Sequence, residues 1–155
     1  MADANVEEVK KMLKFLQDAQ KNIYTGVGKT IGKACALIQR DAQESMRDTQ
    51  IDTSKTYYTY NKSKAHHPSA EGFPPAVDTG TLRRSITYRV DEMKLEGEVG
   101  SVITNPPYGA YLELGTTRDG RRLIKPRKWL QPAIDRNLDK IKDMFGDAVK
   151  VAIKQ

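Results

Sequence analysis

The residues most able to carry out chemistry in this chain occur without the partners that such chemistry needs. Gly28-Lys29-Thr30 resembles the end of a phosphate-binding loop, but that loop requires a glycine where this chain has Ile23. His66 and His67 are the only histidines, whereas a zinc site needs three or four ligands at defined spacing. No motif combines a nucleophile, a base and an orienting group. We therefore expect no catalytic residue, no cofactor and no bound metal.

Composition and charge set broad limits on function. The chain has 155 residues, a formal net charge of +6 and 38% hydrophobic residues, whereas soluble domains are roughly 45–50% apolar. Its length fits one domain. The low apolar content indicates either an extended, unburied part or a core that a partner completes. The basic charge suits nucleic acid or an acidic protein, and it identifies neither.

Cysteine usage and hydropathy exclude several classes of protein. Cys35 is the only cysteine, so no disulfide can form within the chain, and its helical surroundings predict a buried thiol. Residues 1–11 lack the apolar core of a secretory signal, and no run of about 18 apolar residues occurs. We expect a protein that is made in a cytosol and has no membrane-spanning helix.

The first third of the sequence predicts a long helix over residues 6–46. Its apolar residues recur every three or four positions and share one face: Val6, Val9, Leu13, Leu16, Ile23, Val27, Ile31, Ala34 and Ile38. Three glycines interrupt this pattern, Gly26, Gly28 and Gly32, and each costs about 1 kcal/mol relative to alanine. Either the helix breaks near residues 25–28, or the glycines let another backbone approach closely. An unbroken helix of this length would predict contacts beyond the chain itself.

Residues 49–81 have no sustained period and predict an extended loop or arm. Such long structureless segments are uncommon inside a compact domain. This one carries apolar anchors that a free loop would have little reason to carry: Tyr57, Tyr58, Tyr60 and Phe73. Residues 56–60 also have the composition of a short strand. We expect the four aromatic side chains to contact neighbouring subunits, which would order residues 49–77.

Residues 82–103 predict a β-hairpin with a connection at residues 91–94. Each half of the hairpin has an alternating apolar face, which Arg84 interrupts. A shift of one residue would turn one of these faces to the other side of the sheet. The two faces coincide in the register with the cross-strand pairs Val90–Leu95, Ile86–Val99 and Leu82–Ile103.

The rest of the chain predicts a short helix at residues 108–114, a basic loop at residues 116–128 and a final helix from about Trp129 to Ile153. Pro132 would lie in the first turn of the final helix, where proline is tolerated. The loop has one acidic residue, Asp119, and six basic ones: Arg118, Arg121, Arg122, Lys125, Arg127 and Lys128.

The function of the basic loop stays open between a solvated surface, a protein contact and a DNA contact. Nucleic-acid modules usually interleave aromatic and basic residues, and no aromatic residue occurs in the loop before Trp129. We favour the protein contact and expect Arg118, Arg121 and Arg122 to reach a partner.

Together these elements predict an α+β fold in a single domain, residues 1–155. It would have a long N-terminal helix (1–48), an extended loop or arm (49–81), and a small antiparallel sheet with a C-terminal helix packed on it (82–155).

Three segments between residues 78 and 133 resemble the motifs of a known family. Residues 78–86 resemble its D-T-G-x-L-x-x-S-I motif, and residues 108–116 its Y-A-x-x-x-E-x-G-T motif with Gly109 inserted or shifted. Residues 126–133 resemble its P-R-P-F-L-x-P-A motif, with Lys128 and Trp129 in place of proline and phenylalanine. The family is the phage morphogenesis group named for gene product ten of a lambdoid siphophage. The positions that carry the resemblance include Thr79, Gly80, Leu82, Ser85, Tyr108, Glu113, Gly115, Thr116, Pro126, Leu130 and Pro132.

The motif residues also make sense as architecture. Gly80 and Gly115 suit turns that need a positive φ. Leu82, Ile86, Leu130 and Ala133 suit a core between a sheet and a helix. Glu113 could pair with a basic group or cap backbone amides.

The resemblance implies a non-enzymatic virion protein of a tailed bacteriophage, located at the neck or the top of the tail after assembly in the host cytoplasm. It implies a neck, tail-completion or head–tail joining subunit that forms a homo-oligomeric ring, with six copies favoured. Its partners would be tail-terminator, head-closure or tail-tube proteins, and contact with packaged DNA is left open. The alternative, which rests on charge alone, is a basic DNA-binding accessory protein. A small hydrolase is a third and weaker class.

Overall fold

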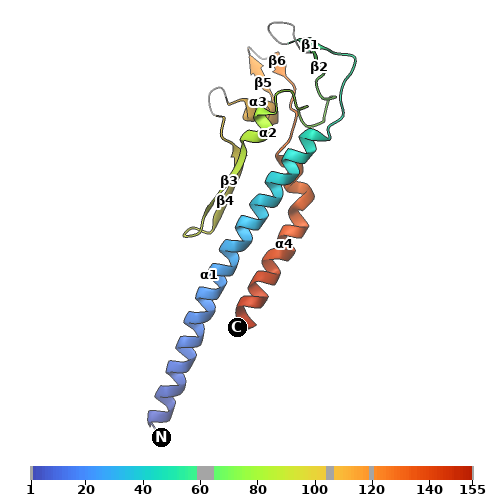
Figure 1. Cartoon of the computed structure of the whole chain (residues 1–155). Coiled ribbons are helices and arrows are strands. Elements are labelled where there is room, and N and C mark those ends of the chain that lie inside the picture. The colour runs from blue at the N-terminus through green and yellow to red at the C-terminus, as the bar shows by residue number, and fades with distance from the viewer. Residues whose placement is uncertain (1, 59–64, 104–106, 119–120, 155) are drawn as a thin grey trace. The chain divides into compact units, whose positions relative to one another are not determined.

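The computed structural model describes residues 2–58, 65–103, 107–118 and 121–154, without the side chains of residues 2–5, 118 and 121–123 (Figure 1). The predicted mixture of helices and sheet is confirmed. In chain order the elements are α1 (Ala2–Arg47), β1 (Tyr57–Tyr58), β2 (Ala65–His66), α2 (Thr81–Ser85), β3 (Ile86–Asp91), β4 (Glu96–Ser101), α3 (Tyr108–Leu114), β5 (Thr116–Arg118), β6 (Arg121–Ile124) and α4 (Gln131–Lys154).

The described strands form three two-stranded sheets, β1–β2, β3–β4 and β5–β6. The chain divides into two compact units. We call residues 1–34, 90–97 and 139–155 the first unit, and residues 35–89 and 98–138 the second unit. The single domain that the sequence suggested stays a prediction.

Helix α1 runs unbroken through its three glycines, so the first of the two alternatives for this segment is wrong. In the first unit, Gly26 faces the backbone of α4: a Cβ atom at Gly26 would lie 3.7 Å from the carbonyl oxygen of Ala148. A Cβ atom at Gly32 would lie 4.0 Å from Cγ2 of Val90. These are ordinary van der Waals distances, so the glycines border neighbouring segments without being required by them.

The core of the second unit joins parts of α1, α2, α3, α4 and the β3–β4 hairpin. Its buried side chains are Ala42, Met46, Leu82, Ile86, Leu112, Trp129 and Ala133, with Ile38, Val99 and Leu130 packed against them. The predicted core positions Leu82, Ile86, Leu130 and Ala133 are therefore confirmed. Burying one large apolar side chain contributes roughly 1.5–3 kcal/mol, and Ile86 is 1% exposed.

The first strand of the predicted hairpin begins later than expected, because Thr81–Ser85 form the short helix α2. Gly80, at φ 75°, precedes this helix, and its carbonyl oxygen accepts the backbone N–H of Arg84 at 2.9 Å. Leu82 and Ile86 are four residues apart, so one helical turn brings both side chains to the same core. The prediction of a strand over residues 82–85 is wrong, and Arg84 had already interrupted its alternation.

The β3–β4 hairpin is confirmed, but its predicted register is wrong. Leu95 lies in the turn at φ 54°, outside β4, and so does not pair with Val90 as a strand residue. At the base of the hairpin, the N–H of Val102 donates to the carbonyl oxygen of Ser85 at 3.0 Å, where the predicted register had placed Gly100. A shift of two residues leaves every side chain on its original face, so coincident apolar faces cannot detect it.

Asp91 sets the position of the connection between β3 and β4. Its Oδ1 accepts the backbone N–H groups of Met93 and Lys94, each at 3.0 Å. Aspartate side chains commonly stabilise turns by accepting amides two or three residues later. The connection therefore has the predicted four residues, but it comprises residues 92–95 rather than 91–94.

Part of the predicted basic loop forms two paired strands, so the loop assignment is wrong for residues 116–118 and 121–124. The antiparallel strands β5 and β6 pair Thr116 with Ile124, Thr117 with Arg122 and Arg118 with Arg121, with an irregularity after Thr116. The β-branched residues favour strands, whereas like charges opposite each other are unfavourable. The arginines therefore made this segment look like a loop, although its threonines and Ile124 favour strands.

The predictions for α3 and α4 are confirmed with small shifts of their ends. Helix α3 spans Tyr108–Leu114 as predicted, and Gly115 follows it at φ 74°. Helix α4 begins at Gln131 instead of Trp129 and has Pro132 in its first turn. In the part of the chain that the structure describes, no helix is long and apolar enough to cross a membrane.

Candidate interaction site

The second unit brings the three motif segments together, and Glu113 makes the most extensive link between them. Oε2 of Glu113 accepts the backbone N–H groups of Trp129 at 2.6 Å and Leu130 at 2.9 Å, and Oε1 accepts that of Gln131 at 3.0 Å. Amides at the start of a helix have no partner within the helix, and a negative charge there also meets the positive end of the helix dipole. Of its two proposed roles, Glu113 has the backbone-capping one.

Trp129 ties the third motif segment to the second. Its side chain is 3% exposed, and its Nε1–H donates to the carbonyl oxygen of Gly109 at 3.0 Å. A buried indole needs such an acceptor. The backbone N–H of Arg127 also donates to the carbonyl oxygen of Leu112, at 2.7 Å. The indole N–H, which a phenylalanine at this position would lack, therefore has a hydrogen-bond partner.

Two glycines of the motif segments lie where no larger residue would fit without movement. A Cβ atom at Gly115 would lie 2.7 Å from the carbonyl oxygen of Ile124 and 3.0 Å from Cδ of Pro126. A Cβ atom at Gly109 would lie 3.0 Å from Cβ of Ser101. Gly109, the inserted or shifted position of its motif, thus permits close packing of α3 on β4.

The hydroxyl groups of the first motif segment are also used within the chain. Oγ of Ser85 donates to the carbonyl oxygen of Leu82 at 2.6 Å and lies 2.8 Å from Oγ of Ser101. Oγ1 of Thr79 accepts the backbone N–H of Thr81 at 3.3 Å. The Thr79 contact stabilises the turn into α2, and the Ser85 contacts join the end of α2 to β4. These polar side chains of the motif therefore serve the chain's own architecture.

Segment 49–81 makes contacts of its own in the second unit. Strands β1 and β2 pair Tyr57 with His66, and the backbone N–H of Asp52 donates to the carbonyl oxygen of Pro68 at 2.8 Å. The short strand suggested at residues 56–60 is confirmed for Tyr57–Tyr58. The described parts of the segment therefore have intramolecular partners, and its ordering by neighbouring subunits stays a prediction.

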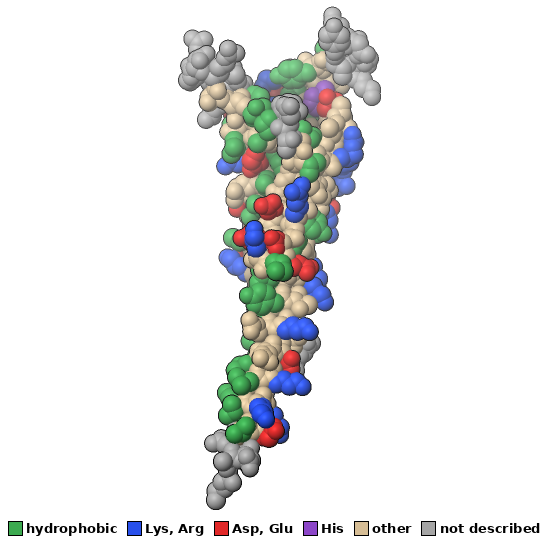
Figure 2. Space-filling model, turned by 90° about the vertical axis from the view of Figure 1, so that its left-hand side faces the viewer, with side chains coloured by type: hydrophobic (Ala, Val, Ile, Leu, Met, Phe, Trp, Pro, Cys, Tyr) green, Lys and Arg blue, Asp and Glu red, His purple; other side chains and the backbone are tan. Residues whose placement is uncertain are grey.

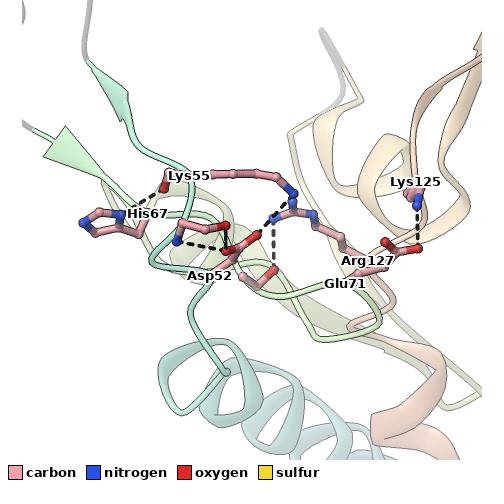
Figure 3. A network of polar contacts seen from close by, with 8 residues as sticks. Asp52, Lys55, His67, Glu71, Lys125 and Arg127 are labelled. Carbon is pink, nitrogen blue, oxygen red and sulfur yellow. Dashed lines mark hydrogen bonds and ion pairs between the residues drawn. The ribbon is translucent and has the colours of Figure 1, made fainter.

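A polar network joins this segment to the chain before α4 (Figure 3). Nη1 of Arg127 donates to Oγ of Ser69 at 3.0 Å, and Nζ of Lys125 lies 2.6 Å from Oε1 of Glu71. The hydrogen bond from Lys125 lowers the pKa of Glu71. Both groups of this ion pair are exposed, so solvent screens their attraction. Two basic residues of the predicted loop thus contact the chain itself.

The histidines belong to the same region and have separate partners. Nδ1 of His67 lies 2.9 Å from the carbonyl oxygen of Lys55. Nδ1 of His66 lies 3.9 Å from Oδ1 of Asp78. Among the described residues, no group of three or more histidine, cysteine, aspartate or glutamate side chains could hold a metal ion.

The predicted interface residues have different outcomes. Tyr57, Tyr58 and Phe73 are exposed, by 58%, 64% and 41%. Tyr60 and the side chains of Arg118, Arg121 and Arg122 lie outside the described residues. The structure thus leaves three of the four aromatic anchors accessible.

Tyr108, a motif residue, is half exposed and lines an apolar groove of about 400 Å³ in the second unit. Met46, Val77, Leu82 and Ile103 also line this groove. By contrast, the motif residue Leu130 is packed against the core of the second unit. The groove adds a concave apolar surface to the exposed aromatic side chains.

The sequence-based predictions did not single out an exposed apolar surface near the start of α1. Six side chains near the start of α1 are each more than half exposed: Val6, Val9, Met12, Leu13, Phe15 and Leu16. We call them the N-terminal apolar face. Figure 2 shows apolar side chains along one side of this end of α1 and charged side chains of both signs on the other. One feature of the sequence could have indicated this exposure: the predicted apolar face of the helix has a gap between Leu16 and Ile23, which separates its first residues from the rest.

No family model, curated protein or solved structure matches the chain.

Proposed function

We propose that the chain is a structural subunit of a tailed bacteriophage, a neck, tail-completion or head–tail joining protein that forms a ring between the head connector and the tail. One observation carries this proposal: the polar side chains of three family-like segments are engaged with the chain's own backbone. Glu113, which caps the start of α4, is the clearest example. Residues used in this way support an architectural role.

Exposed apolar side chains support assembly with other subunits. Monomeric soluble proteins rarely expose large contiguous apolar patches, and such patches commonly mark interaction sites. The N-terminal apolar face has exposed apolar side chains of this kind, and Tyr57, Tyr58 and Phe73 are also exposed. By family resemblance, the partners are other copies of the chain together with tail-terminator, head-closure or tail-tube proteins.

The alternative of a DNA-binding accessory protein has weaker support. Of the basic residues at 116–128, Lys125 pairs with Glu71 and Arg127 contacts Ser69. A lysine that already faces a carboxylate is a poorer partner for phosphate than one that projects alone. The geometry of these two residues therefore favours contacts between protein segments.

Disruption of the gene in the phage or prophage that encodes the chain tests the proposed function. Electron microscopy of the lysate should reveal DNA-filled heads and finished tails that are not joined. Supplying the intact gene from a plasmid should restore joined, infectious particles, and an empty plasmid is the control. Normal joining without the protein would refute the proposal, whereas joined particles that lose their DNA would favour the DNA-binding alternative.

A further inference from the structure

A groove in the second unit is lined mostly by arginine side chains, and we call it the arginine groove. It has a volume of about 300 Å³, and its lining comes from α1 and the short helix α2. The amide of Gln43 holds these two helices together by donating to the carbonyl oxygens of Arg83 and Ile86, at 3.1 and 3.3 Å. The lining residues are Arg40, Gln43, Glu44, Arg47, Arg83 and Arg84.

Most guanidinium groups of the arginine groove lack an acidic partner in the described part of the chain. Arg47 is the exception, since Asp48 accepts two of its N–H groups, at 2.8 and 3.0 Å. The other three arginines have no ion pair with any described residue. Like charges gathered in one groove repel each other, and a guanidinium group binds carboxylates through paired N–H donors. The arginine groove is therefore suited to an anionic partner.

The connection between β3 and β4 carries the opposite charge. Residues 91–96, which we call the hairpin tip, contain three carboxylates and one lysine. Asp91 is already used, because it accepts the turn amides and lies 3.9 Å from Lys94. Glu92 and Glu96 are exposed and form no ion pair within the described ranges. Met93 is 92% exposed, more than any other large apolar side chain that the structure describes.

The hairpin tip has a defined conformation in the first unit. Cγ of Glu92 lies 3.8 Å, and Cδ2 of Leu95 4.0 Å, from the position of a Cβ atom at Gly28. The tip therefore rests on α1, and the Asp91 side chain fixes its turn. A preformed segment loses little conformational entropy when it binds. The tip thus presents its glutamates and Met93 without prior rearrangement.

Other anionic partners suit the arginine groove less well. On α4, for example, Asp139 already pairs with Lys142 at 3.2 Å. The phosphates of DNA are uniformly negative, and in the groove they would also meet the carboxylate of Glu44. The hairpin tip has mixed charge instead, so Lys94 can face Glu44 while the glutamates of the tip face the arginines. The charge pattern of the groove therefore favours the protein segment.

We propose that the hairpin tip of one copy enters the arginine groove of the next copy, with its glutamates against the unpaired guanidinium groups. Each copy has one tip and one groove, so the contact is heterologous and repeats from copy to copy until a ring closes. Charge pairs at such a contact contribute little energy individually, but together they fix orientation and exclude wrong pairings. This inference rests on the proposed ring function and names the two surfaces that meet in it.

Reversing the charges tests the contact in the full chain. The groove variant, Arg40→Glu with Arg84→Glu, and the tip variant, Glu92→Arg with Glu96→Arg, should each self-associate roughly 100-fold more weakly than the wild type, because like charges then face each other. An equimolar mixture should recover to within about tenfold of the wild type, since the acidic groove meets the basic tip and the two unchanged surfaces meet each other. Analytical ultracentrifugation over a concentration series gives the constants.

Two further pairs of substitutions control for changes in net charge and in folding. Lys21→Glu with Lys140→Glu alters exposed lysines outside both surfaces and changes the net charge as much as the groove variant does. This control should associate like the wild type. Arg40→Gln with Arg84→Gln removes the charges without reversing them and should weaken association by roughly tenfold. All variants should keep the circular dichroism of the wild type, because the changed side chains are exposed.

Three outcomes would overturn the inference. A mixture that associates no better than its separate variants would mean that tip and groove do not meet. A groove variant that self-associates normally but no longer binds duplex DNA would assign the arginine groove to phosphate. A wild-type chain that stays monomeric throughout the series would show that the two surfaces do not attract each other. Failure of the proposed function itself would appear separately, as normal head–tail joining without the gene.

Discussion

The two halves of helix α1 carry apolar residues at similar spacings in very different surroundings. Near its end, Ala42 and Met46 are buried in the core of the second unit, at 0% and 2% exposure. Near its start, Val6 and Leu13 are more than half exposed. A 3.6-residue period therefore identifies a face that can be buried, but the available partner decides whether that face is buried within the chain.

The comparison also separates two kinds of contribution. Burial of the second half contributes to folding of the chain, whereas burial of the first half can contribute only when another molecule covers it. Substitutions in the two halves should therefore affect different measurements. At concentrations at which the chain is monomeric, substitutions of buried residues should change its stability more than substitutions of exposed ones.

The largest effect should come from Met46→Ala. Removing a nearly fully buried methionine side chain costs about 2–5 kcal/mol through lost burial and the cavity left behind. The matched change Leu13→Ala should cost less than about 0.5 kcal/mol, because an exposed side chain loses little on truncation. Urea unfolding of both variants measures the difference, and equal losses would contradict the contrast between the halves.

Removal of the α4 cap should have the next largest effect. Glu113→Ala leaves three backbone amides at the start of α4 without their acceptor, and we expect a loss of about 1–3 kcal/mol. Glu7→Ala, which removes only an exposed partner of Lys10 at 3.8 Å, should stay within about 0.5 kcal/mol. Thermal unfolding followed by circular dichroism tests the pair. Indistinguishable melting curves for the two variants would show that the cap has no energetic importance.

Glycine substitutions should have opposite signs in the two units. Gly115→Ala should destabilise by about 1–2 kcal/mol, because φ is 74° and the added Cβ would meet the carbonyl oxygen of Ile124 at 2.7 Å. Gly26→Ala should stabilise by about 0.5–1 kcal/mol, since alanine is the better helix former and its Cβ would make an ordinary contact at 3.7 Å. Denaturant midpoints measure both. A loss of stability in Gly26→Ala would mean that α4 requires glycine there.

The smallest effect should be the pH dependence of the Glu71–Lys125 pair. The pKa of Glu71 is lowered by the hydrogen bond from Lys125. Its contribution to stability is therefore present above the pKa of the unfolded chain and is lost as the pH falls through the lower pKa of the folded state. Glu71→Gln should be slightly less stable than the wild type at neutral pH and equal to it in acid. A difference that persists in acid would show that charge is not its cause.

Much of the fold was predictable from local patterns. The period of apolar residues predicted α1 and α4, and the alternating residues around Ile86 and Val99 predicted the β3–β4 hairpin. Gly80 and Gly115 were expected at positive φ and have φ of 75° and 74°. These features depend on residues that are close together in the sequence, so local patterns are sufficient to predict them.

Other features depend on contacts that a linear pattern does not encode. The hairpin register is set by the Asp91 side chain and by the bond between Val102 and Ser85, and a two-residue shift preserves both faces. The sequence left Glu113 with two roles, pairing with a basic side chain or capping backbone amides, and only the position of the start of α4 distinguishes them. Exposure of the N-terminal apolar face depends on where the partners of α1 end, which the helical period does not report.

The position of the protein in assembled particles decides whether it is a subunit of the neck or tail top. Class averages of tailed particles, compared with and without a small C-terminal tag on this chain, should locate its density. We expect a closed ring at the neck or the top of the tail, with six copies favoured and one tag on each. Tag density elsewhere in the particle, or complete particles without the protein, would contradict it.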